Sequence, residues 1–133
     1  SREAEDIQAE VLRRLYTIWF GVPNMEAIIY WNVVDGYAFN AEPGDFTAGE
    51  NRLAGGLMHF DMTPKPALKV IKQLFEQEFH TDTLVKTDER GKARFKGFYG
   101  CYDVEISVDG SSYKKALHLE KQADKNPVFN FVI

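Results

Sequence analysis

The sequence predicts an α+β fold, in which a partial β/α-barrel segment (helix–strand–helix) is followed by a small antiparallel β-sandwich. Three observations predict it. Apolar residues recur at helical spacing in two stretches, a near-continuous apolar run lies between them, and short alternating runs separated by turn residues fill the rest of the chain. We therefore expect two domains, an incomplete barrel repeat at residues 1–80 and a β-sandwich module at residues 81–133.

The composition is that of an ordinary globular chain, since 44% of the 133 residues are hydrophobic and 27% are charged. The net charge of -4 and the scattered lysines and arginines argue against a nucleic-acid partner, which usually needs a basic face. No apolar run approaches the ~20 residues that cross a bilayer, so we expect no membrane partner. A single cysteine excludes a multi-cysteine zinc site. We expect no metal and no other cofactor.

The stretch at residues 27–35, AIIYWNVVD, is the centre of the first domain. It is rich in β-branched and aromatic residues and too short for most helices, which predicts a strand buried on both faces. The strand ends in an aromatic residue, Trp31, and a carboxylate, Asp35, and then opens into a long loop. This order is typical of the C-terminal rim of a β/α barrel, where binding sites lie. The other interpretation, that the two side chains only pack and cap, stays equally open on this stretch alone.

Two amphipathic helices are expected to flank this strand. In residues 3–20, apolar side chains recur every three or four positions, and Gly21 and Pro23 end the helix. In residues 62–79, Thr63 is expected as the N-cap ahead of a second apolar stripe. Both helices should pack against the same sheet.

The loop at residues 40–56 exceeds the ~12 to 15 residues beyond which a structureless loop is usually functional or disordered. Its polar side chains suit a ligand rich in hydroxyl groups; they are Glu42, Asp45, Glu50, Asn51 and Arg52. The other interpretation is a solvated loop that binds nothing.

Two isolated groups, His59 and Cys101, are not expected to act chemically. His59 has no second histidine or cysteine near it in sequence, so it should pack and not bind a metal. Cys101 has no lysine, arginine or histidine near it in sequence to stabilise a thiolate, so it should be structural or incidental.

From residue 81 onward the apolar residues alternate with polar ones. Strands are expected at residues 83–85, 93–98, 102–108, 113–119 and 128–133. Asp109 and Gly110 predict a tight hairpin turn, because both central positions of that turn need φ > 0. Turn residues at 88–91 and 124–126 should close two further connections. These runs together predict the antiparallel sandwich.

Four pieces of sequence, taken in chain order, carry a resemblance to a known family. They are QAE at residues 8–10, Trp31-x-x-x-Asp35-x-x-x-Phe39, DMTPKPA at residues 61–67, and Thr87-Asp88, Gly91 and Phe95 with GFYGCY at residues 97–102. The first three resemble the last repeat of the barrel of glycoside hydrolase family 10, the endo-1,4-β-xylanases. The fourth looks like a β module that follows the barrel in some bacterial and plant members, so the resemblance covers essentially the whole chain.

The resemblance implies that the partner is xylan or a related plant polysaccharide. It implies that Trp31, Asp35, Tyr37 and Phe39 bind the substrate. Two positions depart from the family pattern. Phe39 stands where the family has a second tryptophan and keeps a stacking face without the indole N–H, and Leu68 replaces the usual tyrosine.

The resemblance also implies a retaining hydrolase, in which one carboxylic acid protonates the leaving oxygen and a second carboxylate, ~5 to 5.5 Å away, attacks the anomeric carbon. Both residues are expected before Ser1, and the glutamates at residues 3–10 lie on a helix and not at a strand end. We therefore assign no catalytic residue to this chain and expect the chain alone to be inactive. The resemblance implies a longer, secreted or extracytoplasmic parent protein, and leaves the location of this chain open.

Two other functions stay open. The sandwich could bind polysaccharide without catalysis through its aromatic side chains, Phe95, Phe98, Tyr99 and Tyr102, although alternating aromatic residues more often form a core. The chain could instead be an interaction or assembly module, because a helix–strand–helix segment cannot close a barrel and leaves strand edges unpaired. Self-association, or pairing with the remainder of the barrel, would cover those edges.

Overall fold

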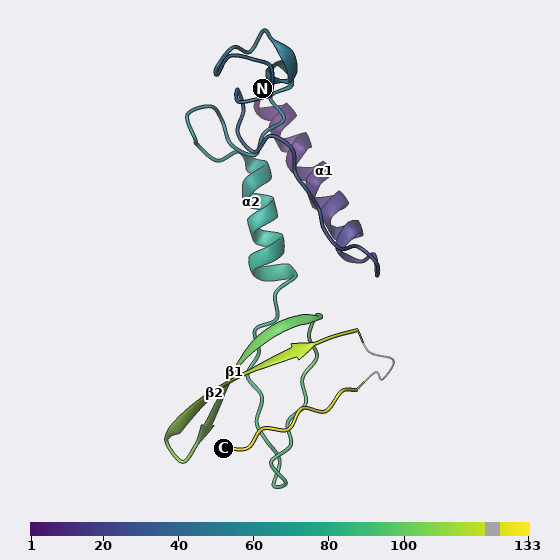
Figure 1. The fold of residues 1–133 in the computed structure, drawn as a ribbon, viewed down its shortest axis with the longest axis vertical. Helices are drawn as coiled ribbons and strands as arrows, with labels where there is room; N and C mark the ends of the chain where they lie inside the picture. Colours follow the sequence, from purple (N-terminus) through teal and green to yellow (C-terminus); the bar gives the residue numbers. More distant parts are fainter. Residues whose placement is uncertain (122–125) are drawn as a thin grey trace. The chain divides into compact units, whose positions relative to one another are not determined.

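A computed structural model describes residues 1–121 and 126–133. The chain is a mixture of helices and a two-stranded antiparallel sheet, in the order α1, η1, α2, η2, β1, β2, which confirms the α+β class (Figure 1). It divides into two compact units, Ser1–His80 and Thr81–Ile133. All of the helices lie in the first unit and both strands lie in the second.

Helix α1 spans Arg2–Phe20 and confirms the first predicted helix. The Ser1 hydroxyl oxygen accepts the Ala4 N–H as N-cap, and the Gly21 N–H bonds back to carbonyls of the last turn. Its buried side chains recur at spacings of three and four; they are Ala9, Leu12 and Tyr16. The spacing that predicted the helix therefore also identifies the face that packs.

Helix α2 spans Pro66–Gln73 and begins later than predicted, with Lys65 and not Thr63 as its N-cap. The Asp61 carboxylate accepts both the N–H and the hydroxyl of Thr63, at 2.9 and 2.6 Å, and closes a separate turn before the helix. Thr63 and Lys65 each precede a proline, which disfavours helical backbone at both positions. The helix can therefore start only at Pro66, and it continues as a single π-helical turn, η2, at Leu74–Glu78.

Helices α1 and α2 pack side by side and hold the hydrophobic core of the first unit (Figure 1). The core residues are Ala9, Leu12, Tyr16, Leu57, Ala67 and Leu74. Ala67 and Leu74 are completely buried, and the rings of Phe20 and Phe79 stack 4.0 Å apart at the ends of α1 and η2. A surface ion pair between Arg13 and Glu78, at 2.7 Å, also joins the two elements.

Residues 27–33 form no strand, and Asn32 within them has a left-handed φ of 58°, so the prediction of a strand buried on both faces is wrong for this structure. Every second side chain faces the helices: Ile28 and Tyr30 pack against the core. The intervening ones face outward, and Ile29 and Trp31 are 87% and 68% exposed. A strand needs a neighbour for its backbone hydrogen bonds, and the described residues place none beside this stretch.

The stretch gains ladder contacts only where it ends. Val34 forms a parallel bridge with Met58. The N–H groups of Leu57 and Met58 both donate to the Val33 carbonyl, and the Asp35 N–H donates to the Met58 carbonyl at 2.9 Å. These bonds bring the end of the long loop back beside residues 33–35.

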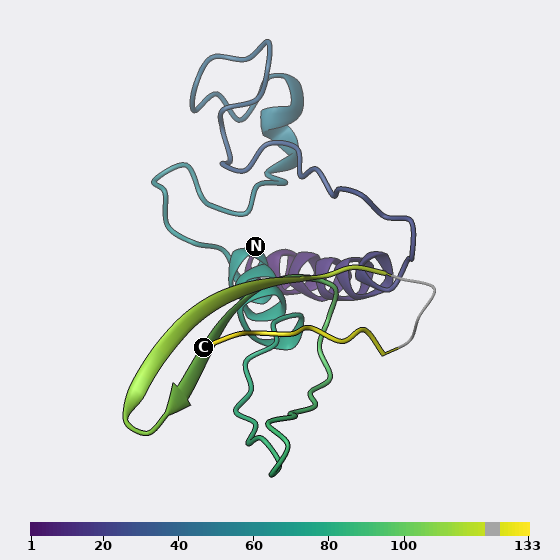
Figure 2. The same cartoon turned by 60° about the horizontal axis from the view of Figure 1, so that its bottom comes forward.

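The second unit contains one antiparallel hairpin, β1 at Gly100–Val108 and β2 at Ser111–Leu119. It confirms the strands predicted at residues 102–108 and 113–119. The turn between them is formed by Asp109 and Gly110, with φ of 48° and 81°, as the sequence predicted. Figure 2 shows the hairpin as a curved ribbon.

The strands predicted at residues 83–85, 93–98 and 128–133 are not formed in this structure. Their outward residues include Leu84, Val128 and Val132, which are 93%, 81% and 89% exposed. Alternation fixes which side chains share a face, but it supplies neither a paired neighbour nor an apolar layer to pack against. The turn predicted at residues 124–126 falls outside the described residues, except for Asn126.

Candidate functional site

The loop at residues 40–56 folds back against residues 31–38, and the two segments line a cavity of about 210 Å³ that is open to solvent, which we call the rim cavity. Trp31, Asn32 and Asp35 line one side of it. Glu50, Asn51 and Gly56 line the other. The loop is therefore an ordered wall of a cavity and contains a short 3-10 helix, η1, at Gly49–Leu53.

Asn51 holds this wall together from inside. It is 2% exposed, and its side-chain oxygen accepts the Ala38 N–H at 2.8 Å. Its side-chain nitrogen donates to the carbonyls of Glu42 and Asp45. From the sequence, Asn51 is grouped with polar side chains suited to a hydroxyl-rich ligand, and no local pattern marks it as the residue that orders the loop.

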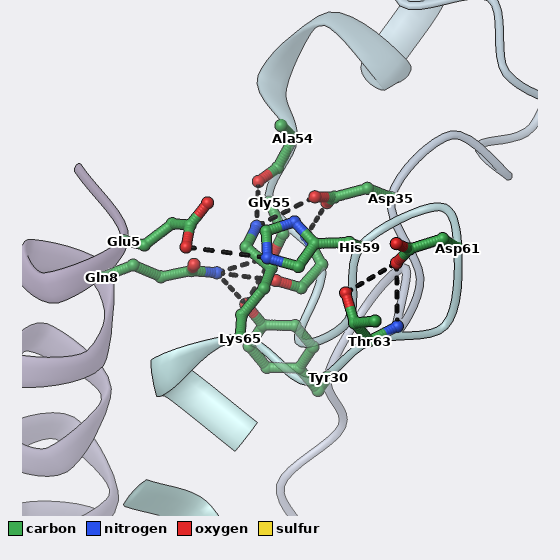
Figure 3. Close-up of polar contacts among 11 residues, drawn as sticks. Glu5, Gln8, Tyr30, Asp35, Ala54, Gly55, His59, Asp61, Thr63 and Lys65 are labelled. Carbon is green, nitrogen blue, oxygen red and sulfur yellow. Dashed lines mark hydrogen bonds and ion pairs between the residues drawn. The ribbon is translucent and has the colours of Figure 1, made fainter. Parts of the chain in front are cut away.

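Asp35, which lines the rim cavity, forms a buried ion pair with Lys65, and the two residues are 7% and 2% exposed (Figure 3). The Lys65 ammonium lies 3.0 Å from Asp35 Oδ2 and donates to the Ala54 carbonyl at 2.7 Å. Asp35 Oδ1 accepts the Gly56 N–H at 2.7 Å. Both oxygens of Asp35 are therefore engaged by protein groups that fix the shape of the cavity.

The close approach at Gly56 predicts a large difference between two neighbouring glycines. A Cβ at Gly56 would lie 2.7 Å from Asp35 N and 2.8 Å from Asp35 Oδ1, whereas a Cβ at Gly55 would meet nothing within 4 Å. We expect Gly56→Ala to destabilise the first unit by about 1 to 3 kcal/mol, because backbone must move. Gly55→Ala is the matched control and should unfold thermally close to wild type. Equal melting temperatures for the two variants would contradict the packing described.

Helix α1 holds the end of the loop through Gln8, whose side chain points toward it in Figure 3. Gln8 Nε2 lies 2.9 Å from the Gly55 carbonyl oxygen and 3.0 Å from that of Gly56. The Tyr30 hydroxyl donates to the same Gly55 carbonyl at 2.7 Å. The QAE motif of the sequence thus contributes a contact between the helix and the rim cavity.

His59 lies beside this contact, with Nε2 3.7 Å from Glu5 Oε2 (Figure 3). The Thr63 hydrogen bonds to Asp61 hold the pKa of that carboxyl below its usual value. Within residues 1–121 and 126–133, no three histidine, cysteine or carboxylate side chains gather as a metal site would require. These residues therefore form contacts between segments of the chain and do not line the rim cavity.

Among the described residues, the hydrogen bond that holds the Trp31 side chain is at the N–H edge of its indole. Its Nε1–H donates to Glu50 Oε2 at 3.0 Å, and the Asn32 side-chain amide donates to the same oxygen at 3.0 Å. With 68% of its surface exposed, the indole offers a flat apolar surface to solvent. The pairing of Trp31 with a carboxylate in the long loop was not expected from the sequence.

The structure brings two of the four predicted site residues to the rim cavity. Trp31 and Asp35 line it, whereas Tyr37 and Phe39 do not. Tyr37 stacks on Phe60 with ring centroids 5.1 Å apart, and Phe39 is 78% exposed. The two aromatic residues beyond Asp35 therefore lie outside the cavity in this chain.

In the second unit, the structure gives Cys101 a histidine neighbour from a distant part of the sequence, and its structural or incidental role stays a prediction. Cys101 pairs with His118 across the hairpin, and its Sγ lies 3.0 Å from His118 Nδ1. The residues next to Cys101 in the sequence do not include His118, which lies 17 positions away, so they give no sign of this contact. The contact could have been predicted from the turn at Asp109 and Gly110. This turn fixes the antiparallel register, and in that register Cys101 lies opposite His118.

The described part of the chain contains no helix with the length and apolar character of a membrane span. Comparison with known protein families finds none whose sequence pattern matches this chain, and comparison with curated proteins finds no match either. The contacts around the rim cavity and the sequence motifs that form it are therefore the basis for assigning a function.

Proposed function

We propose that this chain is the C-terminal part of a retaining glycoside hydrolase similar to family 10, and that its rim cavity binds a sugar unit of β-1,4-xylan. In this proposal the first unit supplies the last repeat of a β/α barrel, and residues 27–34 form a strand only when strands of the parent barrel pair with them. The second unit supplies a β-sandwich module that follows the barrel. The parent protein acts outside the cytoplasm, where plant polysaccharide is found.

The observation that carries the proposal is the exposed indole of Trp31 at the edge of a cavity that Glu50 and Asn32 also line. Flat aromatic surfaces stack on the apolar faces of sugar rings, and carboxylate and amide groups bond to hydroxyl groups. Glu50 and Asn32 supply such groups next to the indole. At about 210 Å³ the cavity is smaller than a typical pocket of ~300 Å³ or more, so it suits one sugar ring.

The four proposed substrate-binding residues act differently in this arrangement. Trp31 supplies the stacking surface. Asp35 keeps the cavity in shape, because its oxygens hold the Gly56 N–H and the Lys65 ammonium. Tyr37 and Phe39, outside the cavity, would contact neighbouring sugar units of a longer chain.

Sugar binding can be tested on the isolated chain through its two tryptophans. We expect xylotetraose to shift the indole N–H signal of Trp31 in ¹H–¹⁵N spectra and to leave that of Trp19 in place. Trp31→Ala should weaken binding about fivefold or more, since a stacked aromatic contact contributes on the order of 1 kcal/mol. Signals confined to residues 95–102 would instead favour a carbohydrate-binding β module. No shift anywhere would exclude xylan as the ligand.

Binding without turnover is the second expected result. Retaining hydrolysis needs two carboxyl groups flanking the scissile bond, and the proposal places both outside this chain. We expect no release of reducing sugar from xylan above background. Activity that disappears when a glutamate of this chain is replaced would refute the proposal.

A second proposed function is assembly, favoured by the exposed apolar stretch at residues 27–33. Its outward side chains are apolar and its backbone has no strand beside it among the described residues. An unpaired edge of this kind is a template for another strand. In the parent hydrolase the remainder of the barrel would cover it, and in the isolated chain another copy would do so.

A further inference from the structure

We propose that Glu50 is a positioning residue, which holds Trp31 in the orientation that binds sugar. The inference rests on the proposed function, and it assigns to Glu50 the role of fixing the Trp31 side chain at the rim cavity. Nothing in the sequence pairs Glu50 with Trp31, which lies 19 positions earlier.

The first step is the geometry of the shared oxygen. Glu50 Oε2 accepts hydrogen bonds from the Trp31 indole and from the Asn32 amide, each at 3.0 Å. The two donors are consecutive residues on one wall of the cavity, and the acceptor lies in η1 on the other wall. One carboxylate therefore ties the two walls together at the end where the indole lies.

The second step concerns the backbone. Asn32 has φ of 58°, the left-handed conformation, which is uncommon for residues other than glycine although asparagine adopts it more readily than most. The side-chain bond to Glu50 is a contact that holds it. Losing this bond would release the backbone directly after Trp31 and change the direction of the indole.

The third step is exposure. Because Trp31 is 68% exposed, packing restrains its ring weakly. Asn51 and Asp35 fix the far end of the cavity through buried contacts with Ala38 and Gly56. Next to Trp31, the wall is held instead by the two hydrogen bonds that Glu50 accepts from Trp31 and Asn32.

Two substitutions of Glu50 separate positioning from direct contact with sugar. Glu50→Gln keeps a side-chain oxygen that can accept both hydrogen bonds, whereas Glu50→Ala removes it. Glu26→Ala is the matched control, because Glu26 is an exposed glutamate close to the same stretch and outside the cavity lining. The Trp19 indole signal reports whether each variant keeps the helical core.

The readouts are the Trp31 indole N–H signal without sugar and the affinity for xylotetraose. We expect Glu50→Ala to shift that signal, to speed its exchange with water and to weaken binding by roughly five- to tenfold. We expect Glu50→Gln to keep the signal position closer to wild type and to bind within about twofold. Glu26→Ala should match wild type in both readouts.

An unmoved Trp31 signal in a folded Glu50→Ala variant would overturn the inference, whatever happens to binding. Loss of affinity in Glu50→Gln with the indole signal unmoved would also overturn it, because Glu50 would then contact sugar through its charge. If wild type binds no xylotetraose while Glu50→Ala still shifts the indole, the proposed function fails and the positioning role of Glu50 stands.

Discussion

Replacing Asp35 by alanine is expected to destabilise the first unit by about 3 to 5 kcal/mol, because the Lys65 ammonium would stay buried without its carboxylate. Lys65 is 2% exposed, so its charge is shielded from water in the folded unit. The variant would also lose the acceptor for the Gly56 N–H. Urea unfolding followed by circular dichroism measures the difference.

Two controls make this result specific. The double variant Asp35→Ala with Lys65→Met should recover at least half of the lost stability, since replacing both members of a buried pair by apolar groups is often nearly neutral. Glu10→Ala breaks the exposed pair with Arg14 and should cost less than about 1 kcal/mol. A double variant as unstable as Asp35→Ala would show that the pair is not the cause.

The second large effect expected is self-association of the isolated chain at micromolar concentration. The chain exposes 10900 Å², whereas two separate compact domains of the same total mass would expose roughly 8,500 Å². The difference exceeds the ~800 Å² that each partner contributes to a standard interface. Sedimentation velocity should therefore show dimers or larger species.

The stretch at residues 27–33 is the surface expected to associate. Ile29→Lys should shift the sedimentation profile toward the monomer, because it places a charge in the middle of the outward apolar row. Leu84→Lys is the matched control, since Leu84 is equally apolar and 93% exposed but lies in the second unit. A folded monomeric wild type with slow amide exchange at residues 28–34 would exclude this interface.

Contacts between near neighbours could be predicted from the sequence. The spacing in residues 3–20 placed α1 within one residue of its observed start, since capping and helical periodicity are local. The Asp109 and Gly110 pair placed the hairpin turn for the same reason, because its conformation depends on those two residues. At residues 62–65 the turn closed by Asp61 outweighed Thr63 as an N-cap.

Contacts between distant segments could not be predicted in this way. Asp35 and Lys65 are 30 positions apart, and Gln8 reaches Gly55 across 47. A single sequence shows which side chains are polar, but not which of them will meet. The apolar run at residues 27–34 shows the same limit, because its composition suits a central strand while strand formation depends on neighbours elsewhere.

Lys65 belongs to two parts of the first unit, and it connects the start of α2 to the walls of the rim cavity. Its backbone caps α2, while its ammonium group grips Asp35 and the Ala54 carbonyl. The lysine is therefore fixed at its backbone by the helix and at its ammonium group by Asp35 and the Ala54 carbonyl. A substitution at Lys65 would therefore disturb the start of α2 and both walls of the cavity together.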